Sequence, residues 1–341
     1  MFAGDNDFSE AMHYEGLGGG KVHCHLCGHD CQINEGKRGI CGVRENRGGT
    51  LVSLVRDRMS SMNADPIEKK PLYHFHPGTM SLSFGTIGCN FGCAHCQNWS
   101  ITMVEPGKRN LRPLDPEMVP LLARDMGCQG VSWTYNEPTI WYETTLEGSR
   151  AASKEGLYTN YVTNGYIQET PLREIAPVLG AMNIDVKAFR EGFYKDVCKA
   201  RLQPVLETSE LAKELGVFVE LTYLVIPDLN DSHEEFHGFS EWVRDRLGID
   251  TPVHFSRFHP DFKMQERGRT PRSTMKRACD TARAAGLEHV YVGNIHQPED
   301  EMTRCASCGT VLVDRAGFHS QVRFGSDGRC PKCGKGVPFV L

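Results

Sequence analysis

Short apolar runs alternate with stretches of helical spacing between Met80 and Asn294. Runs rich in β-branched and aromatic residues, most of them preceded by a glycine, predict strands. The predicted strands are Ser81–Ile87, Gly130–Thr134, Leu157–Val162, Met182–Val186, Val217–Val225, Val253–Phe258 and His289–Val292. Repeated strand–helix units favour a parallel sheet with helices outside it. We therefore expect an α/β fold, a partial (β/α)6 barrel of the TIM type, with its chemistry at the carboxyl ends of the strands.

Helix boundaries between these strands are also marked. Asp115-Pro116 and Thr170-Pro171 each predict a capping residue followed by a proline at the first helical position. Ser232, with Glu235 three residues later, predicts a capping box. Helices should end at three glycines that precede strands: Gly156, Gly216 and Gly286.

The composition is that of a globular protein. The formal net charge of −5 over 341 residues gives no reason to expect nucleic acid or an anionic membrane as partner. The opening segment MFAGDNDFSE is acidic and lacks the apolar stretch of a signal peptide, and no apolar run approaches a membrane span. Fourteen cysteines in such a chain favour metal ligation in a reducing compartment over disulfides, so we expect a cytoplasmic protein.

The loop Gly88–Asn98 holds three cysteines at C-x-x-x-C-x-x-C spacing: Cys89, Cys93 and Cys96. Three thiolates in one short loop can bind three irons of a 4Fe–4S cluster. The fourth iron then lacks a protein ligand, and an open position is what a catalytic metal needs. The loop follows the first predicted strand, where a barrel places its chemistry. A zinc knuckle is the alternative.

A second set of cysteines forms two C-x-x-C pairs near the C-terminus: Cys305, Cys308, Cys330 and Cys333. The two pairs are roughly twenty residues apart, and Gly309 and Gly334 follow them, as in a four-thiolate zinc ribbon. Four thiolates close the tetrahedron, so we expect structural zinc. A rubredoxin-type iron is the alternative.

A third set lies near the N-terminus: Cys24, Cys27, Cys31 and Cys41. Its uneven spacing fits zinc and an auxiliary iron–sulfur cluster equally well. Three nearby histidines could compete as ligands: His23, His25 and His29. The remaining cysteines stand alone and are expected to be small core residues: Cys128, Cys198 and Cys279.

The C-x-x-x-C-x-x-C loop resembles that of the radical S-adenosylmethionine (SAM) superfamily, in which the amino and carboxylate groups of SAM chelate the open iron. The resemblance implies an enzyme that reductively cleaves SAM to methionine and a 5′-deoxyadenosyl radical, which takes hydrogen from a substrate. It also implies a low-potential electron donor of the flavodoxin or ferredoxin type as partner.

SAM at the cluster needs polar groups just past several strand ends, and the sequence has them. The candidates, in the order of the strands, are Asn136, Glu137, Thr163, Asn164, Asp185, Lys187, Asn230, His259 and Asn294. The carboxylate of Glu137 could receive the SAM ammonium in a charge-assisted hydrogen bond. Taken singly, such residues are also common as helix caps and turn residues.

The barrel resembles that of the pyruvate formate-lyase activating enzymes, a branch that installs glycyl radicals. Glu137 falls where that branch has the Glu of its Gly-Gly-Glu motif, Asp185 and Lys187 match its D-x-K, and Ile226-Pro227 lies near its Val-Pro-Gly turn.

Longer stretches resemble the radical SAM enzyme of the AmmeMemoRadiSam system: Cys24–Leu51, Asp65–Thr79 and His289–Ile295. This resemblance extends from about Lys21 to the C-terminus and implies Memo-like partner proteins. It does not imply a particular substrate.

Three positions depart from the activating-enzyme pattern. His95 stands where an aromatic residue usually lies near the adenine, and its imidazole could still stack there. Val162 replaces the Asp of D-T-N-G, which leaves a monovalent cation beside the SAM carboxylate without that ligand. Asp228 replaces the glycine of the Val-Pro-Gly turn, so that loop should bend differently.

Two histidine-containing segments offer other chemistry. The segment from His233 to His237 matches the H-E-x-x-H motif of zinc proteases, but it begins a capped helix and lacks an evident third ligand, so we expect a polar outer helix face. His254 and His259 are both expected at the end of the sixth strand, inside the barrel mouth.

The sequence thus predicts four segments: a Cys-rich metal-binding segment (1–50), a connector (51–78), the radical SAM barrel (79–300) and a zinc-ribbon-like module (301–341). The expected cofactors are a 4Fe–4S cluster, SAM and zinc. The expected function is hydrogen abstraction from an unidentified substrate. A glycyl-radical activase is one alternative. A non-catalytic iron–sulfur or zinc scaffold is another, although it would not need SAM-like strand ends.

Overall fold

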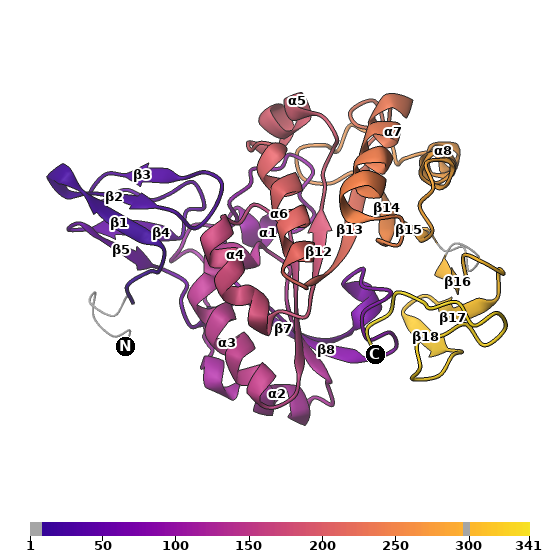
Figure 1. Cartoon of the computed structure of the whole chain (residues 1–341). Coiled ribbons are helices and arrows are strands. Elements are labelled where there is room, and N and C mark those ends of the chain that lie inside the picture. Colours follow the sequence, from indigo (N-terminus) through magenta and orange to yellow (C-terminus); the bar gives the residue numbers. More distant parts are fainter. Residues whose placement is uncertain (1–8, 296–300) are drawn as a thin grey trace.

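The computed structural model describes residues 9–295 and 301–341, so the expectations for residues 1–8 and for a boundary at residue 300 lie outside the described residues. An eight-stranded sheet forms the centre of the molecule, and helices cover its outer side (Figure 1). Short strands from the two ends of the chain form separate groups on either side of this centre (Figure 1).

Seven strands of the central sheet are parallel and lie next to one another in sequence order: β8 (Met80–Gly85), β10 (Gly130–Trp133), β11 (Tyr158–Thr163), β12 (Ala181–Asp185), β13 (Phe218–Val225), β14 (Val253–Arg257) and β15 (Val290–Gly293). All the predicted strands are present, with boundaries that agree to within two residues. Helices separate successive strands, which gives six strand–helix units and a final strand. The expected α/β barrel fold is confirmed.

One strand of the sheet was not predicted. β7 (Ser61–Pro66) pairs antiparallel with β8, with Met62 opposite Phe84, and forms one edge of the sheet. Its sequence, SMNADP, lacks apolar alternation, so the pairing depends on the neighbouring strand more than on its own pattern. The other edge is β15, and the described strands therefore form an open barrel.

The α-helices are α1 (Trp99–Thr102), α2 (Val119–Asp125), α3 (Tyr142–Lys154), α4 (Glu169–Ile175), α5 (Glu191–Phe193), α6 (Gln203–Glu214), α7 (His233–Trp242) and α8 (Arg272–Ala284). Shorter 3₁₀ turns are Gly18–Gly20, Ile67–Lys69, Pro116–Met118, Pro138–Trp141 and Ala176–Val178, and π-type turns are Tyr194–Cys198 and Val243–Leu247. Within the described ranges, no helix combines the length and the apolar character needed to cross a bilayer.

Most of the predicted helix ends are present. The Asp115 carboxylate accepts a hydrogen bond from the Glu117 N–H (3.0 Å), and the Ser232 hydroxyl accepts one from the Glu235 N–H (3.1 Å). Thr170 is not a cap, because α4 begins one residue earlier and Gln168 precedes it. The glycines expected after helices adopt the left-handed conformation: Gly156 (φ 75°), Gly216 (φ 81°) and Gly286 (φ 102°).

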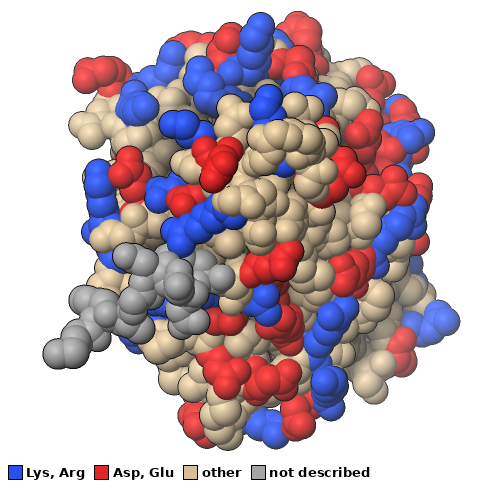
Figure 2. Space-filling view, turned by 90° about the vertical axis from the view of Figure 1, so that its left-hand side faces the viewer, with Lys and Arg blue, Asp and Glu red and all other residues tan. Residues whose placement is uncertain are grey.

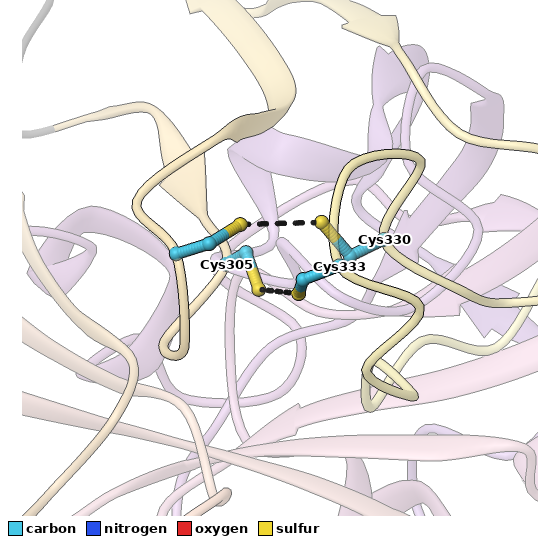
Figure 3. Close-up of side chains that lie close together, drawn as sticks. Cys305, Cys330 and Cys333 are labelled. Carbon is cyan, nitrogen blue, oxygen red and sulfur yellow. Dashed lines mark hydrogen bonds between the residues drawn. The ribbon is translucent and has the colours of Figure 1, made fainter.

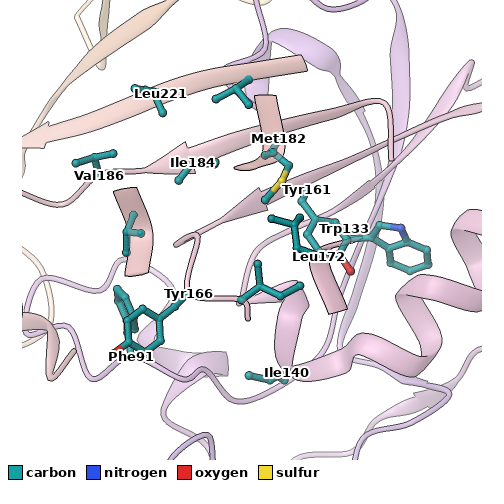
Figure 4. Close-up of a cluster of buried hydrophobic side chains, with 14 of the residues drawn as sticks. Phe91, Trp133, Ile140, Tyr161, Tyr166, Leu172, Met182, Ile184, Val186 and Leu221 are labelled. Carbon is teal, nitrogen blue, oxygen red and sulfur yellow. The ribbon is translucent and has the colours of Figure 1, made fainter. Parts of the chain in front are cut away.

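The main hydrophobic core fills the space between the sheet and its helices and continues beneath the cysteine loop (Figure 4). It includes Trp133 and Tyr161 from the strands, Leu172 from α4, and Phe91 from the loop itself. Complete burial of a large apolar side chain contributes about 1.5–3 kcal/mol. The loop is therefore anchored by the same core that stabilises the barrel.

The N-terminal group of strands comprises β1 (Tyr14–Leu17), β2 (Lys21–Cys24), β3 (Cys31–Ile33), β4 (Arg44–Arg47) and β5 (Thr50–Ser53). Two contacts place it near the carboxyl ends of the barrel strands. The Gly28 N–H donates to the carbonyl of Tyr166, just past β11. His29 Nε2 lies 2.6 Å from the carbonyl of Asn90 in the cysteine loop. A separate short pair joins β6 (Arg58–Met59) to β9 (Arg112–Pro113).

The C-terminal group comprises β16 (Thr303–Arg304), β17 (Val311–Ala316) and β18 (His319–Val322). It docks at the other end of the barrel, near the amino ends of the strands. Val340 pairs in parallel with Phe75, ahead of β8, and Phe339 stacks on His74 with ring centroids 4.2 Å apart. The two outer cysteine sets therefore lie at opposite ends of the sheet.

Candidate active site

The cysteine loop begins directly after β8, and its backbone is fixed from two sides. The side chain of Asn136, past β10, accepts from the Thr86 N–H and donates to the Gly88 carbonyl, both at 3.0 Å. Gly88 has φ 89°, and a Cβ there would lie 2.6 Å from a methyl carbon of Val43 and 3.0 Å from the carbonyl oxygen of Cys41. Only glycine fits this contact between the loop and the N-terminal strands.

Each cysteine of the loop has a polar neighbour at its sulfur. Cys89 accepts from the Phe91 N–H at 3.4 Å and, more weakly, from Asn164 Nδ2 at 3.8 Å. The Thr102 hydroxyl lies 3.2 Å from the sulfur of Cys96. Such hydrogen bonds stabilise the negative charge that thiolates and their clusters carry.

Cys198 lies beside Cys93, although its isolated place in the sequence predicted an ordinary core residue. The carbonyls of Cys198 and Val197 accept from the N–H groups of Gly92 (2.8 Å) and Ala94 (3.2 Å), which draws the two segments together. A hydrogen bond from Cys198, and secondarily the charge of Lys187, lowers the pKa of Cys93 against the effect of burial. Sequence spacing offers no signal for this neighbour, because it comes from the turn after α5.

The donor set fits a 4Fe–4S cluster. Burial raises the pKa values of Cys89 and Cys96, and an iron bound at these sulfurs would favour their thiolate forms. Three thiols from one loop at the end of a strand are a donor set that can bind three irons of such a cluster.

Glu137 is buried and accepts three hydrogen bonds from the protein. Its carboxylate accepts from the Thr139 N–H (3.0 Å), the Thr163 hydroxyl (2.7 Å) and the Asn164 N–H (2.8 Å). It thereby caps the turn Pro138–Trp141 and ties the ends of β10 and β11 together. Burial raises the pKa of Glu137, and these hydrogen bonds offset part of that effect. Only its remaining lone pairs are available to an ammonium group.

The predicted polar groups after β11 and β12 converge on the cysteine loop. Asn164 Nδ2 donates to the side-chain oxygen of Asn90 at 2.7 Å. The Lys187 ammonium lies 2.5 Å from the Asp185 carboxylate. Burial alone would lower the pKa of Lys187, but Asp185 and Cys93 raise it, so the lysine is cationic beside the cysteine.

His95 is buried, and neither of its ring nitrogens has a hydrogen-bond partner. Burial, with a smaller contribution from Lys187, lowers the pKa of His95 to about 3, so the imidazole is neutral. An unpaired buried polar group is costly and calls for an explanation. An unpartnered neutral ring at the position expected near the adenine fits a bound nucleoside.

The other candidates are further from the sulfurs or already satisfied. Asn230 is buried and bonds the Ile226 N–H and the carbonyls of Lys187 and Leu224, so it organises the turn after β13. His259 lies near the loop, with Nδ1 3.3 Å from Gln97 Nε2. Asn294 is exposed, with φ 61°, and donates to the carbonyl of Arg257.

The expectation that His254 lies in the barrel mouth is wrong. This histidine is the second residue of β14, and its Nε2 lies 2.7 Å from the Glu220 carboxylate, towards the amino ends of the strands. At the turn after β13, Asp228 has φ 60°, the left-handed conformation that favours the glycine expected there.

The two histidines of the H-E-x-x-H segment, His233 and His237, lie on α7 with ring centroids 6.1 Å apart, and His237 pairs with Glu241.

The C-terminal cysteines gather into one compact group (Figure 3). The sulfurs of Cys305 and Cys333 are 3.6 Å apart, as are those of Cys308 and Cys330. Thiolates bound at about 2.3 Å to one tetrahedral ion are separated by roughly this distance. Hydrogen bonds from the side chain and then the main chain of Thr310 lower the pKa of Cys308 to about 6. This group has the geometry of a closed four-thiolate metal site.

The N-terminal cysteines also converge. They line one small cavity together with His29 and Arg44: Cys24, Cys27, Cys31 and Cys41. Desolvation raises the pKa of Cys41 to about 11. His23 does not compete for this cavity. Adjacent residues of a strand point to opposite faces, so His23 and Cys24 lie on opposite faces of β2.

Comparison with known proteins agrees with this fold and site. The profile of the radical SAM superfamily matches residues 84–239, which include the cysteine loop and the next four strands of the barrel. Residues 84–239 therefore form a radical SAM domain, and the protein is a SAM-dependent enzyme with an iron–sulfur cluster.

The chain is also similar to individual proteins of known sequence or structure. An uncharacterized protein of Methanocaldococcus jannaschii is 44% identical over 335 residues, covering 97% of this chain and 99% of that protein. Pyruvate formate-lyase 1-activating enzyme of Escherichia coli is 24% identical over 178 residues, covering 51% of this chain and 72% of the enzyme. The structure of Streptococcus suis SuiB bound to precursor peptide SuiA has 16% identity and a TM-score of 0.50, covering 67% of this chain and 52% of that chain, and shares the fold.

Proposed function

We propose that this cytoplasmic enzyme acts in an AmmeMemoRadiSam-type system, where it abstracts hydrogen from a substrate with a radical derived from SAM. When bound, a reduced 4Fe–4S cluster and SAM supply homolysis of the C5′–S bond and a 5′-deoxyadenosyl radical. The observation that supports this proposal is the loop of Cys89, Cys93 and Cys96 at the carboxyl end of β8, surrounded by polar groups from the next strands.

The protein's own residues have distinct tasks in this proposal. Cys89, Cys93 and Cys96 hold three irons, and Asn136 holds the loop that presents them. Lys187 offsets negative charge beside Cys93, with Asp185 as its partner. Glu137 and Asn164 fix the adjoining strand ends beside the cysteine loop. Phe91 and Cys93 are buried in the core, which shields this side of the loop from solvent.

His95 is proposed to face the nucleoside part of SAM, since its ring is buried without a protein partner. His259 and Asn294 are proposed to border the substrate side, where His259 approaches Gln97. Thr163 and Asn230 act by supporting neighbouring groups, because their side chains are hydrogen-bonded inside the protein.

The test compares two cysteine variants of the full chain, purified and assayed without oxygen. Wild-type protein reduced with dithionite should convert SAM to 5′-deoxyadenosine and methionine, detected by chromatography. Changing Cys89, Cys93 and Cys96 to Ala should abolish this product and remove the loop's iron. The matched Cys330→Ser variant should retain both. Unchanged iron and product in the triple variant, or S-adenosylhomocysteine as the only product, would contradict the proposal.

A glycyl-radical activase is the second candidate, favoured by the similarity to pyruvate formate-lyase 1-activating enzyme. Its substrate would be a backbone glycine of a partner protein. Incubation of the reduced enzyme and SAM with a glycyl-radical enzyme should then give the radical's electron paramagnetic resonance signal. Binding to a Memo-like protein without that signal favours the first proposal.

The outer cysteine sets are proposed as metal sites. Zinc suits the compact group of Cys305, Cys308, Cys330 and Cys333, because four thiolates leave no open position on a tetrahedral ion, which favours a structural role. The N-terminal set, beside the loop, suits zinc or an auxiliary cluster. Iron and zinc contents of wild type, Cys24→Ser and Cys330→Ser would assign each site. Turnover with reduced flavodoxin or ferredoxin in place of dithionite would test the electron donor.

A further inference from the structure

The face of the N-terminal strands opposite the cysteines carries a second cluster of metal-ligand side chains. Glu15 on β1 and His23 on β2 are direct cross-strand partners, and His25 follows on the same side of the chain. The ligand atoms of these three residues all lie within 4.8 Å of one another. The two imidazole rings are close, with centroids 4.0 Å apart.

The contacts divide into two groups around the rings. Glu15 Oε1 lies 3.6 Å from His23 Nδ1 and 3.3 Å from His25 Nε2. Asp30 Oδ1 faces the other two nitrogens, 3.0 Å from His23 Nε2 and 3.2 Å from His25 Nδ1. Each ring therefore has one nitrogen towards Glu15 and the other towards Asp30.

A neutral imidazole has one N–H and one lone pair, so it cannot donate in both directions. A metal on the Glu15 side requires the tautomers that carry their protons on His25 Nδ1 and His23 Nε2, where Asp30 Oδ1 lies 3.2 and 3.0 Å away as an acceptor. The lone pairs of His23 Nδ1 and His25 Nε2 then both point towards a carboxylate oxygen. In these tautomers two ring nitrogens and one carboxylate oxygen converge within 4.8 Å of one another, which is a donor set for a metal cation.

We propose that Glu15, His23 and His25 bind one divalent transition-metal ion of the zinc type, and that Asp30 orients the two imidazoles. Ligands bound at about 2.0–2.1 Å to one tetrahedral zinc ion are roughly 3.3 Å apart, close to the spacings around Glu15. A carboxylate on the far nitrogen of a ligating histidine is the usual supporting contact. Imidazole and carboxylate together suit zinc better than magnesium or calcium.

The site has three protein ligands and therefore one open position. The exposed fractions are 61% for the Glu15 side chain and 41% for that of His25, so solvent metal reaches it directly. It also shares backbone with the N-terminal cysteine set, because Cys24 lies between the two histidines and Cys31 follows Asp30. An ion bound here fixes the strand that presents Cys24 on the other face.

The test titrates Zn²⁺ into the full-length holoprotein, with its cysteine sites already filled, and follows release to a chromogenic chelator. One rapidly exchanging zinc ion per chain is expected. His25→Ala and Glu15→Gln should each weaken it by more than about tenfold, since changes even outside the ligand shell cost about 10–100-fold. Cobalt should give a spectrum without thiolate charge-transfer bands. Magnesium should not compete.

The matched control is His237→Ala, which removes an exposed histidine 3.1 Å from a carboxylate on α7. It should leave zinc binding unchanged. Loss of the exchanging zinc in His237→Ala but not in His25→Ala would overturn the proposal, because the ion would then be at the H-E-x-x-H segment. It would also be overturned by a cobalt spectrum with thiolate bands, or by no exchanging zinc in wild type. Glu15 is the most exposed ligand, so Glu15→Gln tests the site even if His25→Ala unfolds.

Discussion

The buried pair Arg44–Glu143 joins the N-terminal strands to the barrel, and its removal should loosen that junction. Arg44 on β4 and Glu143 in the first turn of α3 have side chains 2% and 0% exposed. Glu143 also accepts from the Met12 N–H at 2.7 Å, and Arg44 donates to the Met12 carbonyl at 2.8 Å. Glu143→Gln removes the negative charge while keeping the shape, and leaves a buried guanidinium without its counter-ion.

The expected cost follows from this burial. Breaking a buried ion pair by removing one partner destabilises by about 3–5 kcal/mol, whereas an exposed pair contributes about 0–1 kcal/mol. The exposed pair Arg173–Glu169 on α4, with side chains 51% and 65% exposed, provides the matched control Glu169→Gln. Arg44→Met combined with Glu143→Leu should recover much of the loss, because it removes both charges together.

Urea unfolding followed by circular dichroism measures the free energy, and limited proteolysis reports whether the N-terminal strands detach. Glu143→Gln should unfold at lower urea and release an N-terminal fragment, while Glu169→Gln should match wild type. Equal unfolding midpoints for the two variants would refute the reasoning. The pair would then be compensated by water or by neighbouring groups.

Three further changes test other parts of the molecule. Cys330→Ser should lose one zinc per chain and make the C-terminal module sensitive to protease, while 5′-deoxyadenosine formation continues; loss of turnover with an intact cluster would contradict a structural role. Cys198→Ala should lower the cluster's reduction potential by about 20–60 mV in a redox titration, because it removes a hydrogen bond from Cys93; an unchanged potential would mean that the contact does not form. Burial, followed by the electrostatic effect of the neighbouring His289, holds the pKa of His74 well below 6.5. The unfolded chain therefore binds a proton below about pH 6.5 that the folded one does not, so stability should fall as the pH drops from 7 to 5, and His74→Gln should reduce this slope in urea titrations.

Much of the fold could be predicted because its signals are local. Each parallel strand is a short apolar run, and Gly156, Gly216 and Gly286 end helices with the positive φ that favours glycine. β7 was missed because its residues alternate weakly and its pairing depends on β8. His254 was placed in the barrel mouth although the predicted strand already began at Val253, so the error came from grouping it with His259 and not from the strand boundary.

The candidate site was predictable as a loop and a set of strand ends, but not as a network. Spacing identified Cys89, Cys93 and Cys96, yet it could not show that Glu137 is already used by three protein hydrogen bonds. Nor could it bring Cys198 to Cys93, because that contact is made by segments about a hundred residues apart whose meeting depends on the barrel. Contacts between distant segments are set by tertiary packing, which local patterns do not encode.

The pairing of Val340 with Phe75 has a consequence for how the molecule is assembled. Phe75 leads into the first barrel strand, yet its partner is synthesised some 265 residues later. During translation, the seven parallel strands can form before this contact exists. Until Phe339 has been synthesised, the ring of His74 lacks the stacking partner that covers it. The segment around Val340 therefore covers the amino end of the first barrel strand only after all seven parallel strands have been synthesised.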